Sequence, residues 1–324
     1  MRCLALAKGW QGAGGSVSWT MAEDLPSLEQ RLEREGFVFK KIAAMTGSIS
    51  DAEQTVAEAK RANASWVIVD GYRFAPDYLR RLKAAGLKVL FLDDDGRFDF
   101  YASDVVLNQN ISADPKMYDK RERFTQLLLG PEYILLRPEF LAESRVREHP
   151  LTGRKVLVTM GGSDPENLTE KVLTALSHVR GDFEARIVIG AGNRRQDELQ
   201  ALADRLAPRI TLERNPQNMA PLMGWADVAI SGAGSTCWEL AYMGLPSIVI
   251  ALSADQQGIA QALAEREIAI SLGWHANLSE KQISNALMQL LNDQELRRTM
   301  SERGRNLVDG KGAARVVKFL QGSI

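Results

Sequence analysis

One stretch decides the fold of this chain and points to its chemistry: Ser231-Gly-Ala-Gly-Ser-Thr-Cys-Trp-Glu-Leu-Ala-Tyr-Met-Gly-Leu-Pro-Ser-Ile-Val-Ile-Ala-Leu-Ser-Ala-Asp-Gln-Gln257. The apolar run at 226–230 predicts a buried strand before it, and residues 246–252 predict the next one. Between these strands, a glycine turn leads into a helix that Ser235 and Thr236 are placed to cap. This succession is typical of an α/β domain with a parallel sheet.

The glycine turn is a candidate phosphate site. Gly232 and Gly234 allow the backbone to turn sharply and to approach a ligand closely. The amides at the start of the helix, with the hydroxyls of Ser235 and Thr236, favour an anion. Glu239 follows about one turn later, where a carboxylate could accept hydrogen bonds from two ribose hydroxyls. An ordinary turn whose glycines serve only the backbone is the alternative, and this motif alone does not decide between the two.

Two further polar segments follow predicted strands, at the edge where open α/β sheets bind their ligands. The segment after the strand at 246–252 comprises Asp255, Gln256 and Gln257. The segment after the strand at 155–160 is a second glycine turn, which comprises Gly161, Gly162, Ser163 and Asp164. Together with Glu239, these segments favour a site for a nucleotide diphosphate.

The composition is that of a globular protein of two domains. The chain has 324 residues, of which 45% are hydrophobic and 25% charged. A net charge of −1 argues against non-specific binding to nucleic acid or to anionic membranes, and no apolar run approaches the ~18 residues of a membrane span. Because Cys3 and Cys237 lie far apart, we expect a reduced, cytoplasmic protein without structural disulfides. His149, His178 and His275 are scattered, so we expect them at the surface or at helix ends and predict no metal site.

The first half of the chain alternates predicted strands and helices, which indicates a doubly wound parallel sheet. The predicted strands lie at 16–22, 38–42, 66–70, 88–92 and 104–107, and the helices at 1–9, 25–35, 51–63 and from Pro76 onward. Asp70 and Tyr72 follow one strand, and either a ligand-facing or a packing role is open to them. The triplet at 93–95 follows the next strand and is interpreted as a solvated turn or a helix cap, with catalysis as the alternative.

The segment from 127 to 150 is predicted to cross between two domains, at 1–148 and 149–324. The second domain has predicted strands at 155–160, 185–189, 210–213 and 269–272, besides the two described above. Its helices are expected at 196–206, 219–225, 293–308 and 313–321, with one more begun by a capping box at Ser279. We expect the last helix to pack back on the N-terminal domain.

In combination, these motifs closely resemble the UDP-2,4-diacetamido-2,4,6-trideoxy-β-L-altropyranose hydrolases of pseudaminic acid biosynthesis (PseG-type), which are relatives of the peptidoglycan N-acetylglucosaminyltransferase. The resemblance covers nearly the whole chain. In the second half it is carried by Gly161-Gly-Ser-Asp164, Asn218-Met219, Ser231-Gly-Ala-Gly-Ser-Thr-Cys-Trp-Glu239 and Asp255-Gln-Gln257. In the first half it is carried by Val69-Asp-Gly-Tyr72, Leu92-Asp-Asp94 and Leu107-Asn-Gln-Asn110.

The resemblance implies a GT-B architecture, in which two Rossmann-like doubly wound domains face a cleft. It also implies an activity: water attacks the anomeric carbon of a UDP-diacetamido-trideoxyhexose with inversion and releases UDP, without a metal or another cofactor. The expected partner is the small-molecule UDP-sugar, with no nucleic acid and no membrane, and the expected state is a monomer. The residues implied to bind the substrate are Gly161, Gly162, Ser163, Asn218, Met219, Gly234, Ser235, Thr236, Glu239 and Gln256. Tyr72 and Gln257 are implied to be catalytic.

The chain departs from the family in two places. Gln256 stands where the family usually has Asn, and the extra methylene could shift a sugar contact. The family also opens with a strand and a Gly-x-Gly-His-x-x-Arg-Cys turn whose His is catalytic, whereas this chain begins at Met1-Arg2-Cys3. We therefore expect an N-terminally truncated chain that is inactive as given and is restored by a short upstream extension. Two alternatives stay open: a GT-B UDP-sugar glycosyltransferase, and a catalytically dead nucleotide-sugar binding module.

Overall fold

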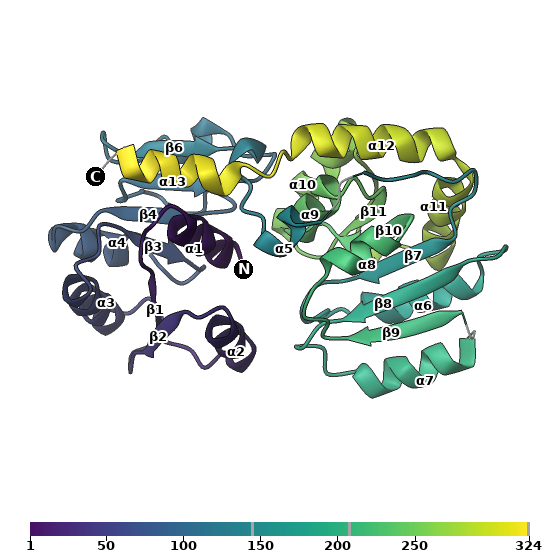
Figure 1. The fold of residues 1–324 in the computed structure, drawn as a ribbon, viewed down its shortest axis with the longest axis horizontal. Helices are drawn as coiled ribbons and strands as arrows, with labels where there is room; N and C mark the ends of the chain where they lie inside the picture. The colour runs from purple at the N-terminus through teal and green to yellow at the C-terminus, as the bar shows by residue number, and fades with distance from the viewer. Residues whose placement is uncertain (144–145, 207–208, 323–324) are drawn as a thin grey trace. The chain divides into compact units, whose positions relative to one another are not determined.

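The computed structural model describes residues 1–143, 146–206 and 209–322, which form two α/β units (Figure 1). Unit 1 comprises Met1–Arg137 and Lys311–Ile324, and unit 2 comprises Pro138–Gly310. The first boundary thus lies at 137/138, about one short helix before the predicted 148/149. The crossover expected at 127–150 is wrong in its first part, because Gln126–Leu129 pairs with a neighbouring strand as β6 of unit 1.

Unit 2 is built on a six-stranded parallel sheet with the order β12-β11-β10-β7-β8-β9. The strands are β7 Lys155–Thr159, β8 Glu184–Ile189, β9 Ile210–Arg214, β10 Val228–Gly232, β11 Ser247–Ala251 and β12 Ala269–Trp274. The helices are α5 Pro138–Leu141, α6 Leu168–Ser177, α7 Gln196–Leu206, α8 Ala220–Trp225, α9 Thr236–Tyr242, α10 Ala254–Glu265, α11 Glu280–Asn292 and α12 Gln294–Leu307. The central strands are apolar along their length because both of their faces are buried.

The direction in which unit 2 adds strands reverses at β7. The chain moves from β7 to β8 and β9 on one side, and then returns to place β10, β11 and β12 on the other. Since all these strands are parallel, the carboxyl ends of β7 and β10 lie side by side at one edge. Such a reversal point is where open α/β sheets bind their ligands.

A buried arginine closes the end of α11. This helix begins with the predicted capping box between Ser279 and Gln282. At its other end, Arg297 has an exposed fraction of 0%. Its Nη1 donates to the carbonyl oxygens of Leu290 and Leu291, each at 2.6 Å, and its Nη2 donates to the Pro150 carbonyl. Arg297 therefore satisfies helix-end carbonyls and ties the chain at 150 to the end of α11.

Unit 1 contains two separate parallel sheets. One has the order β3-β4-β5-β6, with β3 Val67–Asp70, β4 Val89–Leu92 and β5 Val105–Asn108, and the other pairs β1 Ser18–Met21 with β2 Val38–Lys41. The helices are α1 Arg2–Gly12, α2 Pro26–Arg34, α3 Ile49–Arg61, α4 Pro76–Ala84 and α13 Gly312–Gly322. The short helices at Pro115–Tyr118 and Pro131–Tyr133 are of the 3-10 type.

Helix α1 packs on two different cores. Ala5 and Leu6 join the core formed by the four-stranded sheet and α13, whereas Leu4 and Ala7 join the core beneath β1 and α2. Figure 1 shows α1 and α13 side by side, so the two ends of the chain belong to the same unit. Helix α1 therefore connects the two sheets of unit 1.

Candidate functional site

Two glycine loops lie at the reversal point of the unit 2 sheet. The loop that follows β7 contains Gly161, Gly162 and Ser163, all three of them exposed. The loop that follows β10 contains Gly234 and Ser235. Because β7 and β10 are neighbours, these loops flank the same point of the edge.

The loop after β7 is held in place from two sides. Asp164 is buried, and its carboxylate accepts from the amides of Leu168 and Thr169 at 2.8 and 2.9 Å, which secures the first turn of α6. On the other side, the amide of Gly192 donates to the Gly162 carbonyl at 2.9 Å. The buried edge of the loop is thus fixed by hydrogen bonds, while its glycine backbone faces outward.

Gln256 lies beside the loop after β10. The Gln256 Oε1 accepts from the Leu252 amide at 3.0 Å, and its Nε2 lies 3.4 Å from where a Cβ at Gly234 would stand. Part of the Gln256 amide therefore holds the turn between β11 and α10, a role that the sequence analysis did not foresee. Ser235 stands at the N-cap of α9 as expected, but its hydroxyl makes no capping hydrogen bond.

The other predicted residues of unit 2 lie on the segments that follow the strands. Glu239 is half-buried on the first turns of α9, and Thr236 is the first residue of that helix. The side-chain oxygen of Asn218 accepts a hydrogen bond from the Ala220 amide at 2.9 Å, at the start of α8. Met219 is the N-cap residue of that helix. Gln257 is exposed on α10.

In unit 1, polar residues gather where β3, β4 and β5 end. Asp70 is the last residue of β3, Asp94 follows β4, and Asn110 follows β5. Asn110 donates to the Asp94 carboxylate at 3.3 Å and to its carbonyl at 3.1 Å. Because parallel strands end at one edge, three segments far apart in the sequence meet here.

Arg2, the first residue of α1, joins two of these carboxylates. Its Nη2 donates to Asp70 at 2.8 Å, and its Nη1 donates to Asp94 at 2.6 Å. Burial opposes the charge of Arg2, but the two carboxylates outweigh burial and raise its pKa. Burial likewise opposes ionisation of Asp70, yet Arg2 lowers its pKa, so the pair is charged at neutral pH. Burial, together with Asp70, raises the pKa of the Cys3 thiol, which donates to Asp70.

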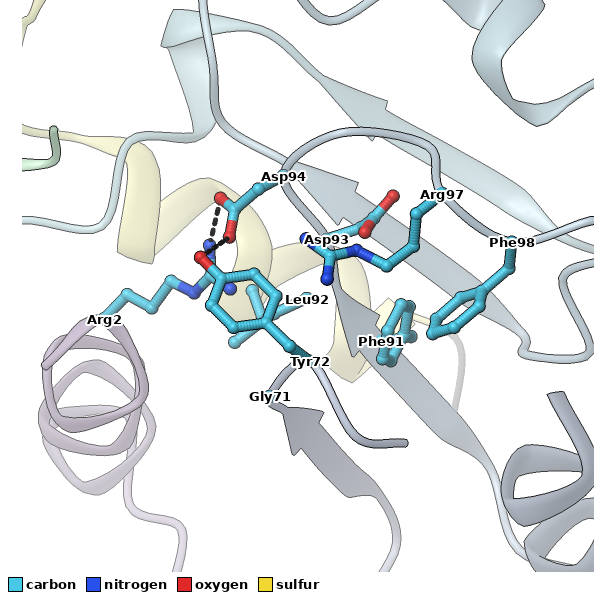
Figure 2. A pocket seen from close by; sticks show the side chains of 9 residues that line it. All are labelled: Arg2, Gly71, Tyr72, Phe91, Leu92, Asp93, Asp94, Arg97 and Phe98. Atoms are coloured by element: carbon cyan, nitrogen blue, oxygen red, sulfur yellow. Dashed lines mark hydrogen bonds and ion pairs between the residues drawn. The ribbon is translucent and has the colours of Figure 1, made fainter. Parts of the chain in front are cut away.

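Tyr72 completes this cluster at the wall of a small pocket, where Figure 2 shows Tyr72 and Arg2 both directed toward Asp94. The Tyr72 hydroxyl donates to Asp94 at 3.2 Å, and the side chain is 62% exposed. The Arg97 guanidinium lies 4.3 Å from the centre of the Tyr72 ring. Asp70 and Tyr72, which follow the same strand, thus belong to one cluster, and Arg2 and Asp94 connect them.

The interpretation of the triplet at 93–95 as a solvated turn or helix cap is wrong for Asp93. Its side chain is only 4% exposed and accepts from the hydroxyls of Tyr101 and Tyr118 at 2.9 and 3.0 Å. The Gly96 amide also donates to it, at 3.0 Å. Asp93 thus anchors the loop that carries Asp94 toward the pocket.

The histidines occupy structural positions. His178 caps the end of α6, and His275 packs on Trp274, with ring centres 4.4 Å apart. His149 differs from the expected surface residue, because its Nε2 is buried and has no hydrogen-bond partner among the described residues. Burial, and then the nearby Arg147, lower its pKa to about 4. In the described parts of the chain, no three His, Cys, Asp or Glu side chains are placed to hold a metal ion.

Arg2, Arg97 and Asn110 were not singled out from the sequence as site residues. Arg2 meets its partners across 68 and 92 residues, a distance at which no local pattern exists. The family's Gly-x-Gly-His-x-x-Arg-Cys turn ends in an Arg-Cys pair, which corresponds to Arg2 and Cys3 in this chain. This pair was the one available signal that Arg2 belongs to the site. Asn110 stood in a quoted motif without an assigned role.

Within residues 1–143, 146–206 and 209–322, no helix is both long and apolar enough to span a membrane.

Sequence comparison finds one matching domain family and several relatives of the chain. The glycosyltransferase family 28 C-terminal domain matches residues 156–315. The spore coat polysaccharide biosynthesis protein SpsG of Bacillus subtilis is 30% identical over 235 residues, which are 72% of this chain and 68% of SpsG. The uncharacterized protein MJ1062 of Methanocaldococcus jannaschii is 29% identical over 228 residues, which are 68% of this chain and 46% of that protein.

A third relative is the UDP-N-acetylglucosamine–N-acetylmuramyl-(pentapeptide) pyrophosphoryl-undecaprenol N-acetylglucosamine transferase of Methylococcus capsulatus. It is 32% identical over 179 residues, which are 53% of this chain and 50% of the transferase. The chain therefore spans about half the length of this relative and of MJ1062.

Solved structures share the fold over the whole chain. MurG of Acinetobacter baumannii superposes with a TM-score of 0.70 at 18% identity, covering 99% of this chain and 95% of MurG. The UDP complex of S. aureus MnaA has a TM-score of 0.69 at 12% identity, covering 98% and 91%. Likeness at such low identity shows the fold alone, and it confirms the predicted α/β class with two Rossmann-like units of the GT-B type.

Proposed function

Because the chain belongs to the family of the spore coat polysaccharide biosynthesis protein SpsG and carries a glycosyltransferase family 28 C-terminal domain, we propose that it is an enzyme acting on a UDP-sugar. In this proposal unit 2 binds the UDP, and Tyr72 and Gln257 have the catalytic roles that the resemblance implies. The observation that carries the proposal is the pair of glycine loops at the reversal point of the unit 2 sheet.

Each part of the nucleotide has a proposed partner in unit 2. The backbone amides of Gly161, Gly162 and Gly234, with the hydroxyls of Ser163, Ser235 and Thr236, suit the diphosphate. Glu239 suits the ribose, because a carboxylate can accept from two neighbouring hydroxyls. Asn218 and Met219 would border the nucleotide, and Gln256 and Gln257 would meet the sugar.

The reaction that the comparisons favour is glycosyl transfer. The match to a glycosyltransferase domain and the transferase from Methylococcus capsulatus both support it. An acceptor hydroxyl would attack the anomeric carbon, the bond from that carbon to the diphosphate oxygen would break, and UDP would leave. The acceptor proton would pass to a base or to solvent.

A second candidate is hydrolysis, in which water takes the place of the acceptor. One observation favours it. Asp70, Tyr72, Asp94 and Asn110 carry the resemblance to the hydrolases of UDP-diacetamido-trideoxyhexoses in pseudaminic acid biosynthesis, and these four residues form one hydrogen-bonded cluster through Arg2.

The test has two stages. First, calorimetry on the full chain should show binding of UDP well ahead of ADP or inorganic phosphate, and a preference for ADP would refute the proposal. Second, UDP release from UDP-N-acetylglucosamine and from the UDP-diacetamido sugar is measured with and without sugar acceptors. Release that requires an acceptor supports transfer, and release in water alone supports hydrolysis. UDP binding without release under any condition supports a binding module instead of an enzyme.

A further inference from the structure

Strand β12 contains a β-bulge just before it ends. Val249 of β11 pairs with Ser271 of β12. Two residues later Ala251 pairs with Trp274, so β12 has one extra residue between the two pairs. Gly273 lies in this bulge with a φ of 72°, which a residue with a side chain rarely adopts. Bulges redirect a side chain and are frequent beside binding sites.

The bulge moves Trp274 to the other face of the sheet. Ile270 and Leu272 pack on the core that contains Ile250. Strict alternation along β12 would place residue 274 on that same side. Trp274 is instead the partner of Ala251, and paired residues share a face. Because Ala251 follows Ile250 along β11, Trp274 stands on the face opposite that core.

This position lies at the edge of the sheet that carries the glycine loops. Since all strands of unit 2 are parallel, β12 ends at the same edge as β10 and β11. Trp274 pairs with the residue before Leu252, and the Leu252 amide donates to Gln256 on the first turn of α10, at 3.0 Å. Helix α10 also contacts β12. Trp274 therefore stands beside the helix turn that carries Gln257.

The rings of Trp274 and His275 form a partly exposed pair. Their centres lie 4.4 Å apart, and their planes are inclined by 53°. Among the residues that the structure describes, the indole N–H of Trp274 has no hydrogen-bond partner, and this nitrogen is not one of the buried ones. The pair thus offers an aromatic surface and a hydrogen-bond donor that is open to solvent.

An aromatic surface with a donor beside it suits a sugar ring. One face of a pyranose presents C–H groups that pack on an aromatic ring, and its rim carries hydroxyl oxygens that accept hydrogen bonds. A nucleobase also stacks on aromatic rings, but Asn218 and Met219, which are proposed to border the nucleotide, follow β9 at the opposite end of the strand order from β12. The position beside Gln257, which is proposed to meet the sugar, therefore favours a sugar ring.

We infer that Trp274, together with His275, forms a subsite for a pyranose ring on unit 2. The inference rests on the proposed function, because it takes a sugar of the proposed reaction as the ligand. It adds a pair of residues to which neither the motifs nor the resemblance assigns a role. The ring belongs either to the UDP-sugar or to a sugar acceptor, and the first experiment distinguishes these two sources.

The first experiment is calorimetry on the full chain with UDP, with UDP-N-acetylglucosamine, and with N-acetylglucosamine added to the UDP-saturated chain. Trp274→Leu keeps an apolar side chain but removes the ring. It should weaken one of the two sugar ligands about tenfold and leave UDP unchanged. A loss for UDP-N-acetylglucosamine assigns the subsite to the donor sugar, and a loss for N-acetylglucosamine assigns it to an acceptor.

Trp225→Leu is the matched control for this experiment. Trp225 is also partly exposed, but it ends α8 just before β10 begins, at the opposite edge of the sheet. If Trp274→Leu binds both sugar ligands as the parent chain does, or weakens UDP by the same factor, the inference is wrong while the proposed function stands. If the unsubstituted chain binds neither UDP nor UDP-N-acetylglucosamine, the proposed function fails, and the inference fails with it.

The second experiment separates stacking from a merely structural role. Trp274→Phe keeps a ring but removes the N–H, so it should weaken the sugar ligand only about threefold. A loss as large as that of Trp274→Leu would contradict stacking. The fluorescence change that the sugar produces in the parent chain should also be lost in Trp274→Phe while binding persists. A change of unaltered size would place the sugar away from Trp274.

The third experiment tests the bulge. Gly273→Ala should weaken the same sugar ligand without altering a ring, because alanine is strained at a φ of 72° and the bulge that places Trp274 must shift. Gly36→Ala is the control, since Gly36 has a φ of 74° and a Cβ at either glycine meets no atom within 4 Å. Unchanged sugar affinity in Gly273→Ala would overturn the role of the bulge.

Discussion

Gly190 packs directly against the carbonyl oxygen of Gly162, so that a Cβ at position 190 would lie 2.3 Å from that oxygen. The end of β8 therefore presses on the exposed glycine loop after β7. Gly190→Ala must push this loop outward or strain its own strand, and overpacking of this kind costs about 1–3 kcal/mol of stability. We expect UDP affinity to fall as well, because the loop backbone moves.

Gly224→Ala is the control, since a Cβ there meets no atom within 4 Å. Calorimetry and urea unfolding of both variants check the prediction, which fails if Gly190→Ala binds UDP normally.

Glu239→Ala should weaken UDP by about 1.5–3 kcal/mol, the usual value of a hydrogen bond to a charged group. The same substitution at Glu302, which is exposed on α12, should leave UDP affinity as it was. Isothermal titration of both variants gives the comparison. Equal UDP affinity in the Glu239 variant and the parent chain would make Glu239 an ordinary residue of α9.

Arg297→Met should lower the free energy of unfolding of unit 2 by about 3 kcal/mol or more. The variant keeps most of the volume but leaves the buried carbonyls of Leu290 and Leu291 without their donor. Arg298→Met is the neighbouring control, because Arg298 is exposed and makes a surface pair with Glu295 that is worth little. Urea unfolding should show a loss of less than about 0.5 kcal/mol for this control. Similar losses in the two variants would contradict the capping role of Arg297.

His149 should make the fold sensitive to acid. Its pKa is lowered to about 4 in the folded chain, against 6.5 for a free histidine. Between these values the unfolded chain takes up a proton that the folded chain does not, so stability should fall as the pH falls from 6.5 toward about 4. His149→Gln should reduce this dependence, whereas His178→Gln, which alters an exposed helix end, should not. Urea midpoints at about pH 7, 5.5 and 4.5, values that cover most of this window, measure the difference.

The regular elements could be predicted because their signals are local. The buried strands around Ser231 and the capping box at Ser279 depend on residues within a few positions of one another. Strand β6 was missed for a physical reason. Its short apolar segment at Gln126–Leu129 runs straight into Gly130 and Pro131, which also occur in a connecting segment, and only the pairing with β5 identifies it as a strand.

The position of the two glycine loops in unit 2 was predictable, and that of the polar cluster in unit 1 was only partly so. Around Gly162 and Gly234, short glycine motifs carry the signal. Around Tyr72, the arrangement depends on Arg2, which reaches carboxylates that no sequence pattern links to it. Asp93 was misjudged because its burial depends on Tyr101 and Tyr118, which lie further along the chain and whose hydroxyls donate hydrogen bonds to its carboxylate.

The position of α1 between two cores has a consequence for local unfolding. A sheet of two strands is only marginally stable by itself, so the β1–β2 sheet depends on the contacts that Leu4 and Ala7 make with its core. The same helix carries Arg2 in its first turn, where helices fray. If α1 moves away, the small sheet loses these contacts and Asp94 loses its ion pair with Arg2 in one event. Amide hydrogens of β1 and β2 should therefore exchange with solvent at a common rate.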